Sequence, residues 1–113
     1  MVLLKNGKKI LKNIEIADNF FKRVKGLIGK KHINNEYGLF IPFCNSIHTF
    51  FMASTIDVIM TDEKLKVIYT KENLKPFGFA VCFKATHTFE FASGAIRNKK
   101  IKKGDMFKLK QGD

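Results

Sequence analysis

Hydrophobic residues recur in short stretches along this chain, and in Ile14-Glu15-Ile16 they alternate with a polar position, as is typical of a half-buried β-strand. The first stretches are Val2–Lys5 and Lys8–Ile16, separated by Asn6-Gly7. Asn-Gly between two such segments is a strong signal for a hairpin with a two-residue turn. The pattern therefore predicts an amino-terminal β-hairpin, with Lys8–Ile16 as one continuous strand.

Six more segments have the composition and length of short strands. They are Gly38–Ile41, Ile47–Met52, Ile56–Thr61, Lys66–Lys71, Thr86–Phe91 and Met106–Leu109. Pro42 ends the first of them, Leu74–Gly78 is predicted to be a loop, and Gly104-Asp105 a turn. Strands and tight connections therefore account for most of the chain after residue 37.

One segment has helical spacing instead. Its apolar residues recur at i, i+4, i+7 and i+8, and they are Phe20, Val24, Leu27 and Ile28. Asp18 precedes them as a candidate N-cap, whereas Gly26 and Gly29 favour an early end of the helix. The pattern predicts one short helix that begins at Asp18.

One helix among seven or eight short strands predicts a mainly β or α+β fold. The strands follow one another too closely for helical crossovers, so we expect a mostly antiparallel sheet. A small barrel or sandwich with one short helix packed on it fits these elements. The length of 113 residues is that of a single domain, residues 1–113, and it allows a hydrophobic core without disulfides or metals.

The chain is strongly basic, with 21 Lys and Arg residues, 10 Asp and Glu residues and a net charge of +11. The basic residues cluster in residues 5–31 and 97–110, whereas the aromatic residues are densest elsewhere. Specific nucleic-acid sites usually combine Arg and aromatic side chains on one surface. We therefore expect at most weak, nonspecific nucleic-acid binding.

Two further features concern the cellular compartment. The apolar start of the chain ends at Lys5, too early for a secretory signal, and no apolar run is long enough to span a membrane. Two cysteines, Cys44 and Cys82, are too few for a disulfide scaffold, and the sequence leaves open whether they pair. A cytoplasmic protein with no membrane span is expected.

Chemically versatile side chains concentrate between Cys44 and Asp57. These 14 residues include a thiol, an imidazole, a thioether and a carboxylate, and no Lys or Arg occurs from His32 to Glu63. Such groups bind ligands or metals, or attack carbonyls. The candidate ligand-binding residues are Arg23, Cys44, His48, Phe50, Met52, Asp57 and Glu90.

Metal binding and nucleophilic catalysis are two alternatives for this segment. A metal could use Cys44, His48, Cys82 and His87, but the spacings lack the close Cys-x-x-Cys pairs of typical zinc sites, and we expect no metal and no other cofactor. Cys44 could be a nucleophile with His48 as its base, yet residues four apart on a strand lie about 13 Å apart. Catalysis is therefore a less favoured alternative to binding.

Asp57 and Glu90 each lie between hydrophobic residues of a predicted strand. By alternation they face solvent, or they are buried and need a partner. Arg23 is one of only two arginines and is the candidate partner. An Arg–carboxylate pair would anchor the predicted helix on the sheet.

Two segments resemble each other. Ser46–Ser54 (SIHTFFMAS) and Ala85–Ser93 (ATHTFEFAS) agree at five of nine positions, including a His-Thr-Phe tripeptide. A single such pair does not make a repeat protein. We expect two strands of similar shape that could be neighbours in the sheet.

The order and spacing of residues from Ile14 to Leu109 resemble one family, domain of unknown function 192 (DUF192). The matching residues are Ala17, Arg23, Gly26–Lys30, Gly38–Phe40, Cys44, Ser46–Phe50, Met52, Ile56–Val58, Phe89-Glu90, Gly94 and Gly104-Asp105. The resemblance implies a compact, β-rich domain with a short helix, and it implies no activity, because the function of the family is not established.

These observations favour a non-enzymatic binding or accessory domain. Its site would lie around the segment Cys44–Asp57 and would take a small molecule or a peptide. A small enzyme that uses Cys44 and His48 is the main alternative, followed by a metal-binding protein. The identity of the ligand or protein partner is not encoded in any of these patterns.

Overall fold

The computed structural model describes residues 1–17, 34–50 and 52–112, and this part of the chain consists mostly of β-strands. The strands are β1 (Val2–Lys5), β2 (Lys8–Leu11), β3 (Asn13–Ile16), β4 (Tyr37–Ile41), β5 (Ser46–His48), β6 (Ile56–Thr61), β7 (Val67–Leu74), β8 (Phe79–Val81), β9 (His87–Ala92) and β10 (Phe107–Lys110). A short helix, α2 (Ala95–Asn98), follows β9. The predicted mainly β, sandwich-like fold with mostly antiparallel pairing is confirmed.

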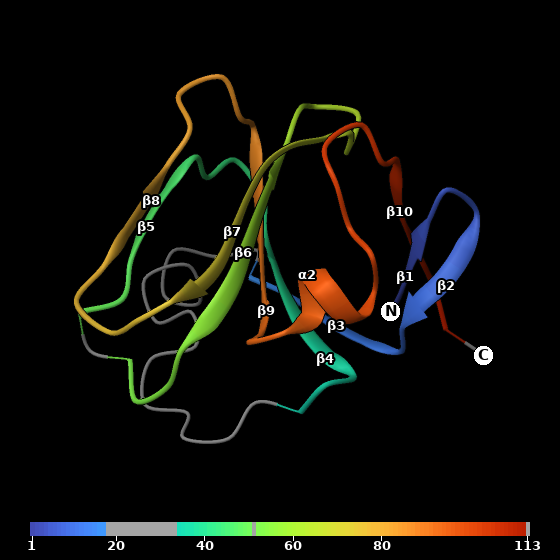
Figure 1. Ribbon diagram of the computed structural model, residues 1–113. Coiled ribbons are helices and arrows are strands. Elements are labelled where there is room, and N and C mark those ends of the chain that lie inside the picture. Colours follow the sequence, from blue (N-terminus) through green and yellow to red (C-terminus); the bar gives the residue numbers. More distant parts are fainter. Residues whose placement is uncertain (18–33, 51, 113) are drawn as a thin grey trace.

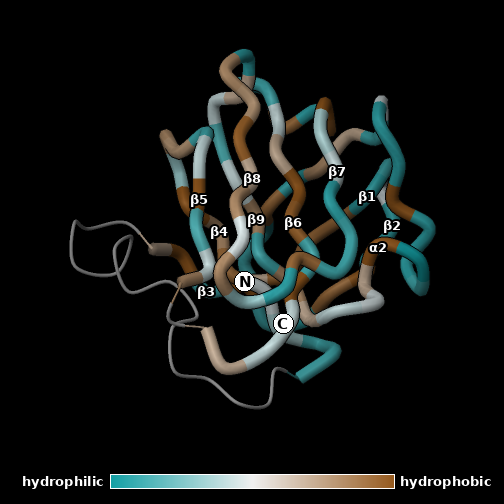
Figure 2. The backbone as a smooth tube through the Cα atoms, turned by 60° about the vertical axis from the view of Figure 1, so that its left-hand side comes forward, coloured by the Kyte–Doolittle hydropathy of each residue, from teal (hydrophilic) through white to brown (hydrophobic). Residues whose placement is uncertain are grey.

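The strands are arranged in three layers (Figure 1). The middle layer is a five-stranded sheet in the order β3-β4-β9-β6-β7, with the sheet β10-β1-β2 on one side and the two-stranded ribbon β5-β8 on the other. In both views the ribbon lies far from β1 and β2 (Figures 1 and 2). The ribbon and the amino-terminal hairpin are therefore on opposite sides of the molecule.

Two clusters of buried side chains fill the spaces between the layers. Phe89 of β9 and Phe107 of β10 belong to the first cluster, and their ring centroids lie 5.2 Å apart. Met60 of β6 and Ala80 of β8 belong to the second cluster. Because both faces of the central sheet are covered, β6 and β9 are buried at every position.

The predicted strand Lys8–Ile16 is wrong, because this segment forms two strands in different sheets. β2 pairs with β1 and β3 pairs with β4, and the chain bends at Lys12. Leu11 and Ile14 are both buried in the first cluster although they are three residues apart. Residues with that spacing face opposite sides of a continuous strand, so the bend is what brings both side chains into one core.

β3 and β4 pair in parallel. We expect no crossover connection where the predicted strands follow one another closely, and this pair is an exception. Residues 17–36 connect them, and a parallel pair needs a connection of about a dozen residues or more. The helix predicted to begin at Asp18 falls within this connection and lies outside the described residues. No helix in the described part has the length and hydrophobicity to cross a membrane.

Three other local predictions need correction. The segment Ile47–Met52 is not one strand: β5 ends at His48, and the carbonyl of Thr49 accepts hydrogen bonds from two different loops. The two segments that contain His-Thr-Phe are not neighbours, since β5 and β9 belong to different sheets. The strand β8 and the helix α2 are additional elements, of three and four residues, that the pattern did not predict.

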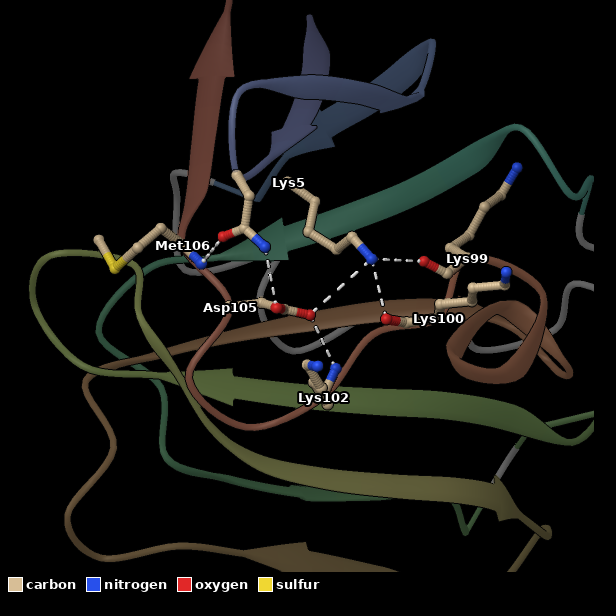
Figure 3. A network of polar contacts seen from close by, with 7 residues as sticks. Lys5, Lys99, Lys100, Lys102, Asp105 and Met106 are labelled. Atoms are coloured by element: carbon tan, nitrogen blue, oxygen red, sulfur yellow. Dashed lines mark hydrogen bonds and ion pairs between the residues drawn. The ribbon is translucent and has the colours of Figure 1, made fainter.

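A buried carboxylate holds the turn before β10 against β1 (Figure 3). Asp105 accepts hydrogen bonds from Asn6 Nδ2 at 3.0 Å and from the backbone nitrogen of Lys102 at 2.9 Å, and Lys5 Nζ lies 3.9 Å from its Oδ2. Burial alone raises the pKa of Asp105, but these hydrogen bonds and the charges of Lys5 and Lys102 outweigh burial and lower the pKa below its usual 3.8. The network stabilises the predicted turn at Gly104-Asp105.

Candidate functional site

β5 and β8 form an antiparallel ribbon whose two faces differ. Ile47 of β5 is paired with Ala80 of β8, and both side chains pack in the second core cluster. Successive side chains of a strand point to opposite faces, so the neighbouring residues point outward. These outward residues are all exposed, and they are Ser46, His48, Phe79 and Val81. The ribbon therefore presents a largely apolar face to water.

Phenylalanines beyond the strand ends extend this outward face. Phe77 precedes β8 and is 74% exposed, Phe83 follows β8 and is 88% exposed, and Phe79 between them is 63% exposed. Phe50 follows β5, and its ring centroid lies 5.2 Å from that of Phe79 and 4.9 Å from that of His48. We call this surface the aromatic face, and its residues are Ser46, His48, Phe50, Phe77, Phe79, Val81 and Phe83.

Part of the aromatic face is hollowed into a shallow groove. The groove has a volume of about 350 Å³ and is lined by Ser46, Ile47, His48, Phe79, Val81 and Phe83. Four of these side chains are apolar, and the other two offer a hydroxyl and an imidazole. Binding sites for small molecules commonly combine an apolar lining with a few polar groups in this way.

Thr49, which is buried, holds the end of the ribbon in place. Its hydroxyl donates a hydrogen bond to the carbonyl of Lys75 at 2.6 Å and accepts one from the backbone nitrogen of Gly78 at 2.8 Å. Its backbone carbonyl accepts a hydrogen bond from the nitrogen of Phe77 at 2.9 Å. Phe77 has φ of 65°, in the left-handed region that residues other than glycine rarely adopt. A defined, strained turn thus directs Phe77 outward.

The only Asp, Glu, Lys or Arg residues in the segments that form the aromatic face are two lysines. Residues 43–56 include no Asp, Glu, Lys or Arg, and residues 74–88 include only Lys75 and Lys84. Both lysines are exposed, one before β8 and one after it. An anionic group on a ligand would therefore meet a favourable charge at either end of the face.

The structure brings two of the predicted site residues, His48 and Phe50, into this surface and places Cys44 beside it. The half-buried Cys44 thiol donates a hydrogen bond to the carbonyl of Ser46 at 3.2 Å, and it packs against the second core cluster. His48 Nδ1 instead accepts a weak hydrogen bond from the backbone nitrogen of Phe50 at 3.4 Å. Thiol and imidazole thus have separate partners, whereas a nucleophile and its base share a hydrogen bond.

Asp57 lies in a different environment, fully buried within β6. Its Oδ1 accepts a hydrogen bond from the nitrogen of Asn73 at 2.9 Å, and its Oδ2 accepts bonds from the nitrogens of Gly94 at 3.1 Å and Ile96 at 2.9 Å. Ile96 belongs to the first core cluster, so this carboxylate faces away from the ribbon. Arg23, which we considered as its partner, lies outside the described residues.

Met52 and Glu90 are buried between the central sheet and the ribbon rather than in the aromatic face. Met52 belongs to the second core cluster. Glu90, which is 5% exposed, lies in β9 opposite Leu39 and Val58, and both of those side chains belong to the same cluster. The two residues are therefore beneath the candidate surface and not part of it.

No three of the four residues considered as metal ligands, all of them in the described part of the chain, lie close enough together to share a metal ion. His87 is buried, its Nδ1 accepts a hydrogen bond from the backbone nitrogen of Phe43 at 3.1 Å, and its ring lies 5.3 Å from that of Phe40. Burial lowers the pKa of His87. Cys44 and Cys82 are free thiols. Within residues 1–17, 34–50 and 52–112, no three His, Cys, Asp or Glu side chains are grouped as a metal site requires.

No strand predicted from the sequence included β8, which supplies part of the aromatic face. Bulky residues at 77, 79, 81 and 83 alternate with the small residues Gly78, Ala80 and Cys82, and this period of two could have predicted a strand. The orientation is the reverse of the usual one, because the small side chains pack inward and the large ones point to water. Alternation predicts two faces but does not say which face is covered.

Comparison with known proteins places the chain in a family. Its residues 1–109 match the profile of DUF192, described as "Uncharacterized ACR". A UPF0127 protein of Thermococcus gammatolerans is 33% identical over 98 residues, which cover 83% of this chain and 64% of the relative. A UPF0127 protein of Thermococcus kodakarensis is 33% identical over 104 residues, which cover 88% and 66%. The match thus spans slightly less than two thirds of these relatives, and the chain belongs to the DUF192 family.

A solved structure shares the fold. It is the crystal structure of a protein of unknown function from Novosphingobium aromaticivorans, with a TM-score of 0.83 and 18% sequence identity. The superposition covers 96% of this chain and 84% of that protein. At this level of identity the likeness shows a shared arrangement of the strands.

Proposed function

For this member of the DUF192 family we propose a non-enzymatic binding function, in which the aromatic face holds an apolar small molecule or a peptide. The observation that supports the proposal is the exposure of Phe77, Phe79 and Phe83 on one surface. Burial of apolar surface contributes about 25 cal/mol per Å² of favourable free energy. Contiguous exposed apolar patches are typical of binding sites. A partner that covers these rings gains that free energy.

The rigidity of the aromatic face also supports binding. The hydrogen bonds of Thr49 hold the turn that carries Phe77, and strand pairing holds Phe79. The rings of Phe50 and Phe79 are in edge-to-face contact, an arrangement that restricts both. A surface that is ordered before binding loses little conformational entropy when the ligand arrives, which favours affinity.

The polar groups of the groove define the kind of ligand. Ser46 and His48 lie between apolar side chains and can each form a hydrogen bond with a ligand. The best fit is a ligand with an apolar body and a few hydrogen-bonding groups. The thiol of Cys44, which is bonded to the carbonyl of Ser46, contributes to the shape of the ribbon rather than to a reaction.

Titration with a library of apolar fragments, followed by two-dimensional NMR of the isotope-labelled chain, tests this proposal. We expect fragments that bind to shift the backbone signals of β5 and β8, and we expect Phe79→Ser to weaken their binding about tenfold or more. Met106→Ser is the matched control, since Met106 is an exposed apolar residue next to β10, on the other side of the molecule. Binding that is unchanged in Phe79→Ser, or shifts confined to other elements, would contradict the proposal.

A further inference from the structure

Among the described residues, β5 is an edge strand with one side of its backbone open. On its paired side, the nitrogen of Cys82 donates a hydrogen bond to the carbonyl of Asn45 at 2.9 Å. In an antiparallel pair, residues whose backbone N–H and C=O groups face the partner strand alternate with residues whose groups face away from it. Because Asn45 faces β8, Ser46 and His48 are the residues of β5 whose backbone groups face away. These two residues direct their N–H and C=O groups away from β8.

Most of these outward backbone groups lack a partner in the described part of the chain. The carbonyl of Ser46 accepts the hydrogen bond from the Cys44 thiol. The N–H of Ser46 and both backbone groups of His48 form no hydrogen bond with another described residue. An exposed edge of this kind is a template for pairing with another extended chain.

The charge of the surface limits the chemistry of such a chain. Lys75 lies four residues before β8 and Lys84 lies three residues after it, no acidic residue lies on the ribbon, and the whole chain carries a net charge of +11. A second copy of this chain would bring the same lysines and the same net charge to the interface. Charge complementarity therefore favours an acidic partner over self-association.

A lipid bilayer fits the geometry less well than a polypeptide does. The lysine-rich β2 and β10 lie on the opposite side of the molecule from the ribbon (Figure 1), so they would not face a bilayer contacted by Phe79 and Phe83. Two lysines add little of the attraction that peripheral proteins obtain from basic clusters. A bilayer would also leave the backbone groups of Ser46 and His48 unused.

We infer that the aromatic face binds an extended, acidic segment of another protein, which adds to the free edge of β5 as a further strand. The inference rests on the proposed function and specifies its ligand. Alternate side chains of the segment would lie beside Ser46 and His48 and extend over the groove towards Phe79, and Lys75 and Lys84 would attract carboxylates near its ends. Backbone hydrogen bonds to Ser46 and His48 would set its register, as in other cases of β-strand addition.

Defined synthetic peptides test the inference with the full chain. The panel consists of peptides of about eight residues, with Val, Leu, Ile or Phe at alternate positions, Thr between them and Asp at both ends. We expect at least one peptide to bind and to shift the NMR signals of β5, with about tenfold weaker binding to Phe79→Ser and unchanged binding to Met106→Ser. Replacing the terminal Asp residues by Lys should weaken binding at low salt, and added salt should reduce this difference.

A scan of backbone N-methylation along the best peptide tests the strand pairing itself. Each N-methyl group removes one backbone donor, and donors of a paired strand face β5 at every second position. We therefore expect an alternating pattern, in which methylation at every second residue weakens binding about tenfold and methylation between those positions has little effect. Uniform effects, or none, would overturn strand addition.

Other outcomes separate this inference from the proposed function. If no peptide of the panel binds while apolar fragments still shift β5 and β8, the inference is wrong and the binding function stands. If fragments fail as well, both are wrong. Vesicles that contain phosphatidylglycerol and capture the parent chain but not Phe79→Ser, in the absence of peptide binding, would assign the face to a bilayer. A dimer in sedimentation that is lost in Phe79→Ser would assign it to a second copy.

Discussion

The carboxylate of Asp57 in β6 accepts a hydrogen bond from the backbone nitrogen of Ile96 at the start of α2, 2.9 Å away and 39 residues later in the sequence. The same side chain accepts bonds from the nitrogens of Asn73 and Gly94. One buried side chain thus joins the central sheet, the end of β7 and the helix. Gly94 has φ of 95°, a conformation that suits glycine, and it lets the chain turn its N–H groups towards Asp57.

Replacement of Asp57 should destabilise the fold. Asp57→Ala leaves three backbone donors without their acceptor in a buried site, so we expect a loss of on the order of 3 kcal/mol in the free energy of unfolding, measured by urea denaturation. Asp57→Asn keeps one oxygen acceptor and should lose less. Glu63→Ala, at an exposed position two residues after β6, is the control and should change stability by no more than about 0.5 kcal/mol. A parent-like midpoint in Asp57→Ala would refute the structural role.

Asp105 should make the protein sensitive to acid. Its pKa in the folded protein is lower than in the unfolded chain, so the unfolded state binds the proton more readily. The stabilisation is therefore fully present above about pH 4 and is lost as the pH falls towards the folded-state pKa. In Asp105→Asn we expect lower stability at pH 7 and a shallower decline between about pH 5 and pH 2. Denaturation series at several pH values measure both, and parallel pH curves would contradict the prediction.

His87 should add a second pH dependence at higher pH. Burial lowers its pKa, so the unfolded chain takes up a proton before the folded protein does, and stability decreases as the pH falls below about 6.5. His87→Asn retains an acceptor for the nitrogen of Phe43 but cannot take up that proton. We expect the decline between about pH 7 and pH 5 to become shallower in this variant.

The other His-Thr-Phe tripeptide supplies the matched control for His87. His48→Asn changes an exposed imidazole, so we expect a melting temperature within a few degrees of the parent. If His48→Asn removed the decline and His87→Asn did not, burial of His87 would be the wrong explanation.

Thr49→Val should loosen the ribbon. The change removes the hydroxyl that bonds Lys75 and Gly78 and leaves both backbone groups without that partner, which costs roughly 1–3 kcal/mol. Hydrogen exchange should accelerate in residues 75–81, and any ligand of the aromatic face should bind more weakly. Thr70→Val, at a half-buried position on β7, is the control and should leave exchange in this segment unchanged. Equal protection in Thr49→Val and the parent would contradict the role of Thr49.

Local sequence patterns were enough to predict much of the sheet. The bounds predicted for Val2–Lys5 and Ile56–Thr61 are those of β1 and β6, because each is a short, mostly apolar run followed by polar turn residues. The pattern failed where the chain bends. Leu11 and Ile14 have the spacing of opposite faces, and only a bend at Lys12 lets both enter the first core cluster.

The candidate site was only partly predictable for a related reason. His48 and Phe50 were predicted as site residues because they lie in a segment with reactive side chains and no lysine. Both are in the aromatic face. Phe77, Phe79 and Phe83 lie about 30 residues further along the chain and join them through the pairing of β5 with β8. Pairing of two segments that far apart closes a long loop, and the entropy lost in closing it must be offset by other contacts. The choice of partner strand therefore depends on tertiary contacts.

The two His-Thr-Phe tripeptides show what the sequence determined and what the tertiary structure decided. The sequence determined that both lie at a strand. In the structure both threonines are buried, and each donates a hydrogen bond to a backbone carbonyl. The tertiary structure decided that His87 is covered by Phe40 and Phe43, whereas His48 faces water. The burial of a side chain depends on which other segments pack over it, and a local sequence pattern carries no information about those segments.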